Sequence, residues 1–458
     1  MATLNRIQKE LTHEGALAVR IDALAQLERS VMSCLLWESE FYEDGQTIGQ
    51  RIAALVKQVP AEDVARVAIK AKEDMRLRHV PLLLVRELMR TKEGRAQAAG
   101  LFPRVILRPD DITEFLAIYW KDNKDEPLAK QVKKHLGASF GKFDEYRLAK
   151  YNGGQKAIKL RDAMRITRPK PATLEQADLW RKLVKGELAT PDTWEVELSK
   201  GGEKKTTFER LMTERKLGTL AFLRNLRNMN QAGIAKATVA AYAEAARIDR
   251  ILPFQFVAAA KAVPAWEGIV EQMMYRCLAE QPKLGGKTVL VVDTSGSMTA
   301  RLSAKSEMSR MDVAAALAIL ARERCEEAVI YCTAGDDLKR VHATMLVPSR
   351  RGFALSDYIT GNEVQGKIGG GGIFLTQCMT HIRKEQYSAD RVIVLTDEQD
   401  CDLKLNPEAA DAFGVRNYLI NVASAKNGIG YRKWLHIDGW SDKVLDYIAK
   451  FESASANE

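Results

Sequence analysis

The segment Thr288–Met298, TVLVVDTSGSM, decides the fold of the C-terminal part of the chain. Its first five residues form an apolar, β-branched run that ends abruptly in Asp-Thr-Ser-Gly-Ser, which predicts a buried strand with polar side chains at its carboxyl end. In open parallel α/β sheets, ligands bind in the crevice beyond the carboxyl ends of the strands. We therefore expect Asp293, Ser295 and Ser297 to lie in a binding site.

One carboxylate and two hydroxyl groups, spaced two residues apart, offer the hard oxygen ligands that suit Mg²⁺ or another divalent cation. The pattern Asp-x-Ser-x-Ser at a strand end resembles the metal-ion-dependent adhesion site of von Willebrand factor A domains. Serines that follow a strand are also common helix caps, so the motif alone leaves both interpretations open. Its context in the chain has to decide between them.

The composition predicts a cytoplasmic protein with more than one domain. A chain of 458 residues exceeds the size at which a single core stops growing. It holds no run of about 18 uncharged apolar residues, and its first residues, MATLNRIQKELTHEG, lack a signal-peptide core. Six scattered cysteines without a C-x-x-C pair indicate reduced thiols.

The positive charge belongs to the first part of the chain. Residues 1–280 carry 47 Lys and Arg against 37 Asp and Glu, a net charge of +10, whereas residues 281–458 carry 22 against 23, a net charge of −1. A basic domain joined to a neutral one suggests an anionic partner for the first, with nucleic acid as the leading candidate. A merely well-solvated surface is the alternative.

Apolar spacing up to about residue 281 is helical nearly throughout. Val64, Val67, Ala68 and Ala71 repeat at i, i+3, i+4 and i+7, the spacing of a buried helix face. Many short helices joined by short turns favour stacked antiparallel pairs, an α-solenoid, over a single bundle.

Two capping signals accompany this pattern. Thr173 has Gln176 three residues later, as in a capping box, and Thr190 precedes Pro191 at a first-turn position. Both predict helix starts.

The stretch Tyr146–Pro171 concentrates basic residues of nearly one sign. On a helix, Arg161, Arg165 and Arg168 lie at i, i+4 and i+7 and share a face, so their guanidinium groups can contact adjacent phosphates. A charge run is more often a solvated face than a binding site, but the uniform sign favours contact with nucleic acid. Arg76 and Arg78, just before Pro81, are weaker candidates for contact with nucleic acid on the inner surface of the helical stack.

Three segments carry a resemblance to a known family. They are TWEVELSKGG (Thr193–Gly202), LGTLAFLRNLRNMN (Leu217–Asn230) and KLRDAMRITRPKP (Lys159–Pro171). Together they resemble the TROVE module of Ro autoantigen, telomerase-associated and vault proteins. A TROVE module followed directly by a von Willebrand A domain is the Ro arrangement, so we expect a TROVE domain over residues 1–281 and an A domain over 282–458.

Strand-like and helical runs alternate over the second domain. The strand-like runs are 328–333, 341–347, 391–396 and 418–422, and the helical runs include 308–324, 375–385 and 407–413. This alternation predicts a doubly wound parallel sheet. The expected fold class is thus α + α/β, a HEAT-like helical repeat ring closed by the A domain, as the Ro resemblance implies.

The resemblance also implies a full metal-ligand set. The strand 391–396 ends in Asp397, which in the family joins the Asp-x-Ser-x-Ser loop at the metal. The family's remaining ligand is a threonine just after a Gly-Gly turn, but here Ile373 takes that place and cannot ligate. Either Thr376 replaces it, or water holds more of the ion.

The Ro resemblance implies an RNA-binding protein without catalysis of its own. Ro proteins form rings, bind the single-stranded 3′ ends of misfolded noncoding RNAs in the central hole, and bind Y RNAs on the outer surface. The resemblance implies a monomeric ring with noncoding RNA and polynucleotide phosphorylase as partners, and neither membrane nor DNA. Arg161 and Arg165 take the positions that contact Y-like RNA, and charge alone adds Lys156, Lys159, Arg168 and Lys170.

A different class of function competes with this one. The A domain could capture a carboxylate of a partner protein through an open metal position, and the helical half would then be a protein-binding solenoid. The positive charge of the helical half favours RNA.

Overall fold

The computed structural model describes most of the chain. The described residues are 11–12, 21–33, 45–122, 126–153, 157–248, 251, 253–279, 283–302, 306–368, 370–402, 416–423, 428–429, 434–439 and 444–455. Contacts divide the chain into two compact units: residues 1–33, 38–45 and 218–458 form the first, and residues 34–37 and 46–217 form the second. This division rests on contacts, so the predicted boundary between residues 281 and 282 stays a prediction.

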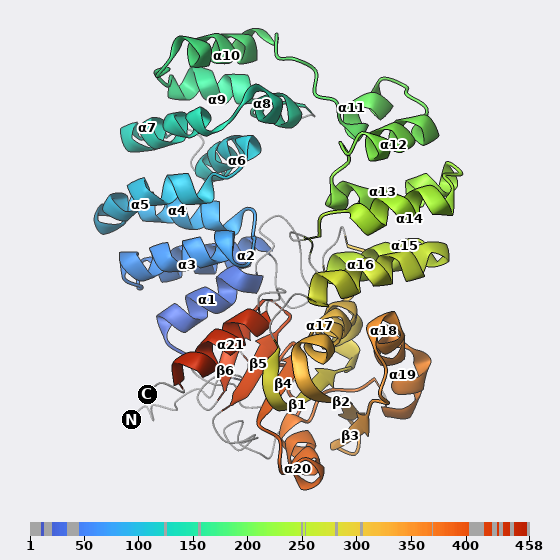
Figure 1. The fold of residues 1–458 in the computed structure, drawn as a ribbon. Helices are drawn as coiled ribbons and strands as arrows, with labels where there is room; N and C mark the ends of the chain where they lie inside the picture. The colour runs from blue at the N-terminus through green and yellow to red at the C-terminus, as the bar shows by residue number, and fades with distance from the viewer. Residues whose placement is uncertain are drawn as a thin grey trace, which may run out of the picture. The chain divides into compact units, whose positions relative to one another are not determined.

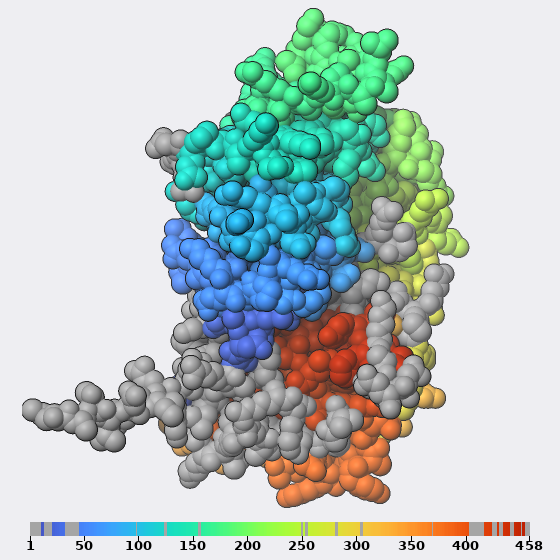
Figure 2. Space-filling view, turned by 90° about the vertical axis from the view of Figure 1, so that its left-hand side faces the viewer, coloured from blue at the N-terminus to red at the C-terminus, as the bar shows by residue number. Residues whose placement is uncertain are grey.

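The second unit is a stack of short helices (Figure 1). Its helices are α2 (Gly45–Val56), α3 (Ala61–Glu73), α4 (Val80–Arg90), α5 (Lys92–Val105), α6 (Pro109–Trp120), α7 (Lys130–Ala138), η1 (Ser139–Lys142), α8 (Glu145–Tyr151), α9 (Leu160–Thr167), α10 (Leu174–Lys185), α11 (Trp194–Ser199) and α12 (Lys204–Thr213). From α3 to α7, a helix packs on its second neighbour along the chain, as α3 does on α5 and α5 on α7. This repeated packing is that of a solenoid, and Figure 2 shows the surface of this unit changing in chain order from blue through cyan to green.

The predicted helix face on α3 is confirmed. Val64, Val67, Ala68 and Ala71 are all fully buried. Because residues at i, i+3, i+4 and i+7 lie on one side of a helix, their spacing in sequence was enough to locate the packed face.

One capping prediction is confirmed and the other is wrong. The Thr173 hydroxyl accepts a hydrogen bond from the Gln176 backbone N–H (3.2 Å), which caps α10. No helix begins at Thr190; α11 begins at Trp194 and is capped by Thr193. Thr190 and Thr193 are both possible N-caps, and the proline after Thr190 favoured the wrong one in the prediction.

The first unit is built on a six-stranded sheet in the order β3-β2-β1-β4-β5-β6. The strands are β1 (Leu284–Asp293), β2 (Cys325–Asp336), β3 (Val341–Leu346), β4 (Arg391–Thr396), β5 (Asn417–Asn421) and β6 (Leu435–Asp438). Five strands are parallel, and β3 is an antiparallel edge strand that returns from β2. The sheet is therefore mostly rather than wholly parallel, because only four residues connect β2 and β3, too few for a crossover.

Helices cover both faces of the sheet, as expected for a doubly wound fold. The helices of this unit are α1 (Ala23–Ser33), α13 (Thr219–Gln231), α14 (Lys236–Ala245), α15 (Pro253–Ala262), η2 (Pro264–Trp266), α16 (Glu267–Ala279), η3 (Gly296–Thr299), α17 (Arg310–Arg324), α18 (Gly352–Thr360), α19 (Asn362–Ile368), α20 (Leu375–Glu385) and α21 (Val444–Ser455). Cys378 and Ile382 of α20 share a buried cluster with Val289, Val291 and Val394 of the sheet. On the other face, α17 packs on β1 and β2, and Tyr418 of β5 donates a hydrogen bond to Glu452 of α21 (2.9 Å).

Helices from two distant parts of the sequence belong to this unit. In the contacts within it, α1 packs against β6 while α15 and α16 pack against α17. Lys261 of α15 forms an ion pair with Asp312, the third residue of α17. Strand β6 was not predicted from sequence, and the helix expected at 407–413 lies outside the described residues.

The described part of the chain contains no helix long and apolar enough to cross a bilayer. The five described cysteines are free thiols, four of them buried. Cytoplasmic localisation stays a prediction.

Candidate functional site

Two neighbouring strands bring Asp293 and Asp397 to the same edge of the sheet. Strands β1 and β4 are parallel, and Val292 lies opposite Leu395 in their register. Asp293 ends β1, and Asp397 is the first residue after β4. Both carboxylates therefore lie at the carboxyl end of the sheet, and both are fully buried.

Short-range hydrogen bonds fix the loop after β1. One carboxylate oxygen of Asp293 accepts from the Ser295 backbone N–H (2.8 Å), and the other accepts from the Thr396 hydroxyl (2.6 Å). The hydroxyl oxygens of Ser295 and Ser297 lie 3.2 Å apart. The structure therefore brings the side chains of this Asp-x-Ser-x-Ser motif together at one place.

Two buried carboxylates at one edge of the sheet need either a positive charge or a proton. Burial, and then the negative charge of Asp397, raise the pKa of Asp293 well above its usual range. The nearest described counter-ion is Arg310, the first residue of α17, whose guanidinium lies 3.4 Å from Asp397 and is itself buried.

Ile373 and Thr376 occupy different environments. Ile373 is fully buried in the apolar cluster between α20 and the sheet, so its side chain belongs to the core. Thr376 is a buried residue in the first turn of α20. Asp400, which the sequence did not single out, caps this helix by accepting a hydrogen bond from the Leu375 backbone N–H (3.1 Å).

These residues fit a divalent cation. Carboxylate and hydroxyl oxygens are the donors that Mg²⁺ prefers, and a bound cation would offset the charge that raises the pKa of Asp293. If present, it would be held by Asp293, Ser295, Ser297 and Asp397.

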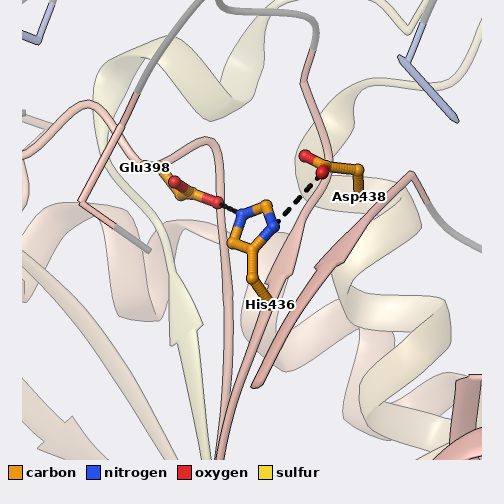
Figure 3. Close-up of side chains that lie close together, drawn as sticks. All are labelled: Glu398, His436 and Asp438. Carbon is orange, nitrogen blue, oxygen red and sulfur yellow. Dashed lines mark hydrogen bonds and ion pairs between the residues drawn. The ribbon is translucent and has the colours of Figure 1, made fainter. Parts of the chain in front are cut away.

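A second cluster of ionisable groups includes Glu398, the residue after Asp397. Figure 3 shows His436 between Glu398 and Asp438, and one ligand atom of each lies within 4.8 Å of the others. His436 Nε2 forms an ion pair with Glu398, and Nδ1 lies 3.2 Å from Asp438. This buried set of a histidine and two acids is a group that could hold a metal ion.

Arg29 makes the second cluster a poorer metal site than the loop. Its guanidinium, on α1, lies 2.9 Å from Glu398 and 3.8 Å from Asp438. Burial lowers the pKa of His436, but the carboxylates of Asp438 and Glu398 raise it by more, so the pKa is about 9. A doubly protonated imidazole cannot ligate a metal, so at neutral pH the cluster is best described as a buried network of two cations and two anions.

Helix α9 carries the predicted basic face. Leu160, Ala163, Met164 and Thr167 are buried on one side of α9. Its other side exposes basic side chains, and further exposed ones flank the helix: Lys159, Arg161, Arg165, Arg168 and Lys170. Lys156 lies outside the described residues.

These basic side chains form few ion pairs. Among the described residues, Lys159, Arg165 and Lys170 have no acidic partner, and Arg161 has only its neighbour Asp162 at 3.8 Å. By contrast, Arg78 is engaged by Asp110 and Glu114, which removes the reason for proposing it as a contact.

Basic residues on a neighbouring helix were not predicted from the sequence. Lys130, Lys133 and Lys134 of α7 are exposed, and α7 packs against α9. The run KQVKKHLGA showed three lysines in five residues. Only the packing of the two helices reveals that it adjoins the α9 face.

A family model matches the middle of the chain. The model of the TROVE domain matches residues 184–330, from the end of α10 into β2. The match includes two of the three segments that carried the resemblance, Thr193–Gly202 and Leu217–Asn230. No match was found among curated proteins.

A solved structure resembles nearly the whole chain. The crystal structure of the Deinococcus radiodurans Ro (RSR) protein aligns with a TM-score of 0.60 and 17% identity, covering 94% of this chain and 99% of that chain. The chain therefore has the fold of a Ro protein, α-helical repeats with an α/β domain. At this level of identity the similarity establishes the fold, and the residues themselves have to carry the functional argument.

Proposed function

We propose that this Ro-like protein binds noncoding RNA, without catalysis of its own, through the basic face of α9. The observation that carries the proposal is the exposure of Arg161 and Arg165 one helical turn apart with no strong ion pair among the described residues. Free guanidinium groups at this spacing can each form bidentate bonds to phosphate oxygens.

The exposed positive charge of the α9 face favours structured RNA as the ligand. Phosphate contacts from Arg and Lys supply affinity without reading sequence, and double-stranded RNA is recognised largely by its backbone. Lys159, Arg168 and Lys170 flank the two arginines and widen the face, and Lys156 is added from the sequence alone. Y-like RNA, RNA quality control and polynucleotide phosphorylase as a partner are the expectations that the Ro resemblance adds.

Charge reversal tests this proposal. The double variant Arg161→Glu, Arg165→Glu should weaken binding of a structured RNA by about ten- to a hundredfold at fixed salt and reduce the salt slope by about 2. The unfolding midpoint should not change, because both side chains are exposed. The matched control is the double variant Arg227→Glu, Arg247→Glu, two exposed arginines of the first unit. Equal affinity of the α9 variant and the wild type in a gel shift would refute the role of α9.

We also propose that Asp293, Ser295, Ser297 and Asp397 hold Mg²⁺ or another divalent cation. The support is the buried carboxylate pair and the convergence of the two hydroxyl groups described above. Thr376 is the proposed further ligand, from its position in the first turn of α20.

Calorimetric titration with Mg²⁺ tests the metal proposal. Asp293→Ala should abolish the binding heat that the wild type gives, whereas Asp336→Ala, at an exposed hairpin position, should leave it intact. Heat that persists in Asp293→Ala would place the ion elsewhere.

One observation favours a protein partner at the metal face as a second function. The β2–β3 hairpin lies beside the loop that precedes α20, since Gly372 N–H donates to Asp337 (2.8 Å), and its tip residue Leu338 is 96% exposed. An open metal position next to an exposed apolar side chain suits a partner segment with an acidic residue. Protein that purifies with an absorbance ratio tilted toward 260 nm would favour RNA as the main ligand.

A further inference from the structure

A cavity in the second unit is separate from the α9 face and from the metal loop. It has a volume of about 500 Å³ and lies between the start of α8 and the segment that leads from α10 to α11. Its lining residues are Glu145, Tyr146, Ala189, Thr190, Pro191, Asp192 and Lys216. This volume falls in the range of small-ligand pockets, which lies at about 300–1,000 Å³.

Tyr146 gives the cavity a flat aromatic surface. Half of this side chain is exposed although it lines a cavity, and the Lys150 ammonium lies 5.9 Å from its ring centroid. Partial burial and then the carboxylates of Glu195 and Asp192 raise the pKa of Tyr146, so the phenol stays neutral at physiological pH. An exposed aromatic ring beside an ammonium group is suited to stacking with a planar ring that carries a phosphate.

The two acids that line the cavity, Asp192 and Glu145, differ in how far other groups already bind them. Arg210 and Lys216 bind both carboxylate oxygens of Asp192, at 2.8–3.1 Å, so this acid is already neutralised. Glu145 is different: one oxygen accepts the Ala189 backbone N–H (3.0 Å), and within the described part of the chain the other has only Lys182 at 3.8 Å. Glu145 therefore retains capacity to accept hydrogen bonds from N–H groups of a ligand.

We propose that this cavity binds one unpaired nucleobase, stacked on Tyr146, with guanine preferred because its N–H edge can donate to Glu145. The proposal rests on the proposed RNA binding and adds a second, single-stranded contact to it. Lys150, whose ammonium lies 5.9 Å from the Tyr146 ring centroid, is placed to contact a flanking phosphate.

The placement of α8 connects this site to the α9 face. Helices α8 and α9 follow one another in the chain, and both pack against α6 and α10. An RNA that lays a duplex on α9 can therefore place an adjoining unpaired nucleotide at α8. A stacked base adds affinity that is tolerant of sequence, and the Glu145 contact adds preference for one base.

The test uses labelled single-stranded pentamers, UUGUU, UUAUU and UUUUU, and the full chain. Fluorescence anisotropy should show that Tyr146→Ala weakens UUGUU binding by about tenfold, whereas Tyr146→Phe, which keeps the ring, binds as the wild type does. Tyr387→Ala is the matched control, because Tyr387 is 86% exposed and lies far from this cavity in the sequence. Glu145→Gln should reduce the preference for UUGUU over UUAUU.

The outcomes separate this proposal from the proposed function of α9. Tyr146→Ala should leave blunt duplex RNA binding unchanged, whereas the Arg161→Glu, Arg165→Glu variant should lose it. Unchanged pentamer binding in Tyr146→Ala, or an equal loss in Tyr387→Ala, would overturn the nucleobase site and leave the α9 proposal standing. Should Tyr146→Ala not fold, photocrosslinking of 4-thiouridine pentamers to the wild-type protein decides: peptides other than those of α8 and residues 189–192 would also overturn it.

Discussion

The exposed face of α9 and the carboxyl end of the sheet are both rich in charge, but they handle it in opposite ways. On α9 the charges have one sign, lie in solvent and have few partners in the described structure. At the sheet edge the charges are buried, and cations such as Arg29 and Arg310 from helices packed on the sheet lie against the acids. Water screens the first set, whereas the second set has to be balanced within the protein.

This difference shows what each region is able to do. Exposed, unpaired guanidinium groups cost little to keep and remain available to a partner from solution. Buried carboxylates stay ionised only when a cation lies beside them, and this cation comes either from the chain or from solution. The cluster at Glu398 has its cations from the chain, whereas Arg310 lies against Asp397, and we propose that an external ion supplies further positive charge to Asp293 and Asp397.

Removing Arg29 should have the largest effect on stability. Arg29→Met leaves Glu398 and Asp438 with His436 as their remaining charged partner in the cluster, and losing one partner of a buried charge network costs about 3–5 kcal/mol. Urea unfolding of Arg29→Met and of Arg66→Met, an exposed arginine, would measure the difference. A cost below about 1 kcal/mol would mean that the network is not balanced by Arg29.

The pH dependence of stability should reveal the same cluster. His436 has its pKa raised to about 9 when folded, so its contribution is fully present below its unfolded pKa of about 6.5 and is lost as pH rises through 9. Glu398, with a pKa lowered to about 2, contributes above about pH 4.5 and loses its contribution as pH falls through 2. Between pH 6 and 10 the wild type should lose about 3 kcal/mol. His436→Gln should lose distinctly less in a matched unfolding series, and parallel curves would exclude His436 as the cause.

Arg310→Met should change both the stability of the protein and its affinity for Mg²⁺. Without this guanidinium no arginine competes with the ion for Asp397, so the ion-free protein should be less stable and Mg²⁺ should bind about tenfold tighter at a pH where both acids are ionised, a change of roughly 1.4 kcal/mol. Calorimetry and thermal shift with and without Mg²⁺ would measure both quantities. The same Mg²⁺ affinity in Arg310→Met and the wild type would show that Arg310 does not compete with the ion.

The smallest effect is expected on the solvent-exposed surface. Arg181→Met removes ion pairs to Asp178 and Glu187 that are about half exposed, and solvent screening should leave the unfolding midpoint unchanged. A shift as large as that of Arg29→Met would erase the distinction between exposed and buried charge.

Local pattern predicted much of the fold and of the candidate sites. The apolar run before Asp293 gave a buried strand, and the 3.6-residue spacing gave the packed side of α3. Strand β6 was not predicted, because its sequence LHID is short, only half buried and contains no long apolar run. The antiparallel β3 was placed in a parallel sheet because alternation of strands and helices does not report the direction of an edge strand.

The sequence by itself determined which side chains could hold a cation and which could meet a phosphate, because these depend on residue type and on spacing within one strand or helix. Only the tertiary structure decided that Arg29 lies on Glu398, Arg310 on Asp397, and Tyr146 in a cavity with Glu145 and Lys216. The members of the first two pairs lie far apart in the sequence and belong to different elements. Their contacts follow from how those elements pack, which no local pattern encodes.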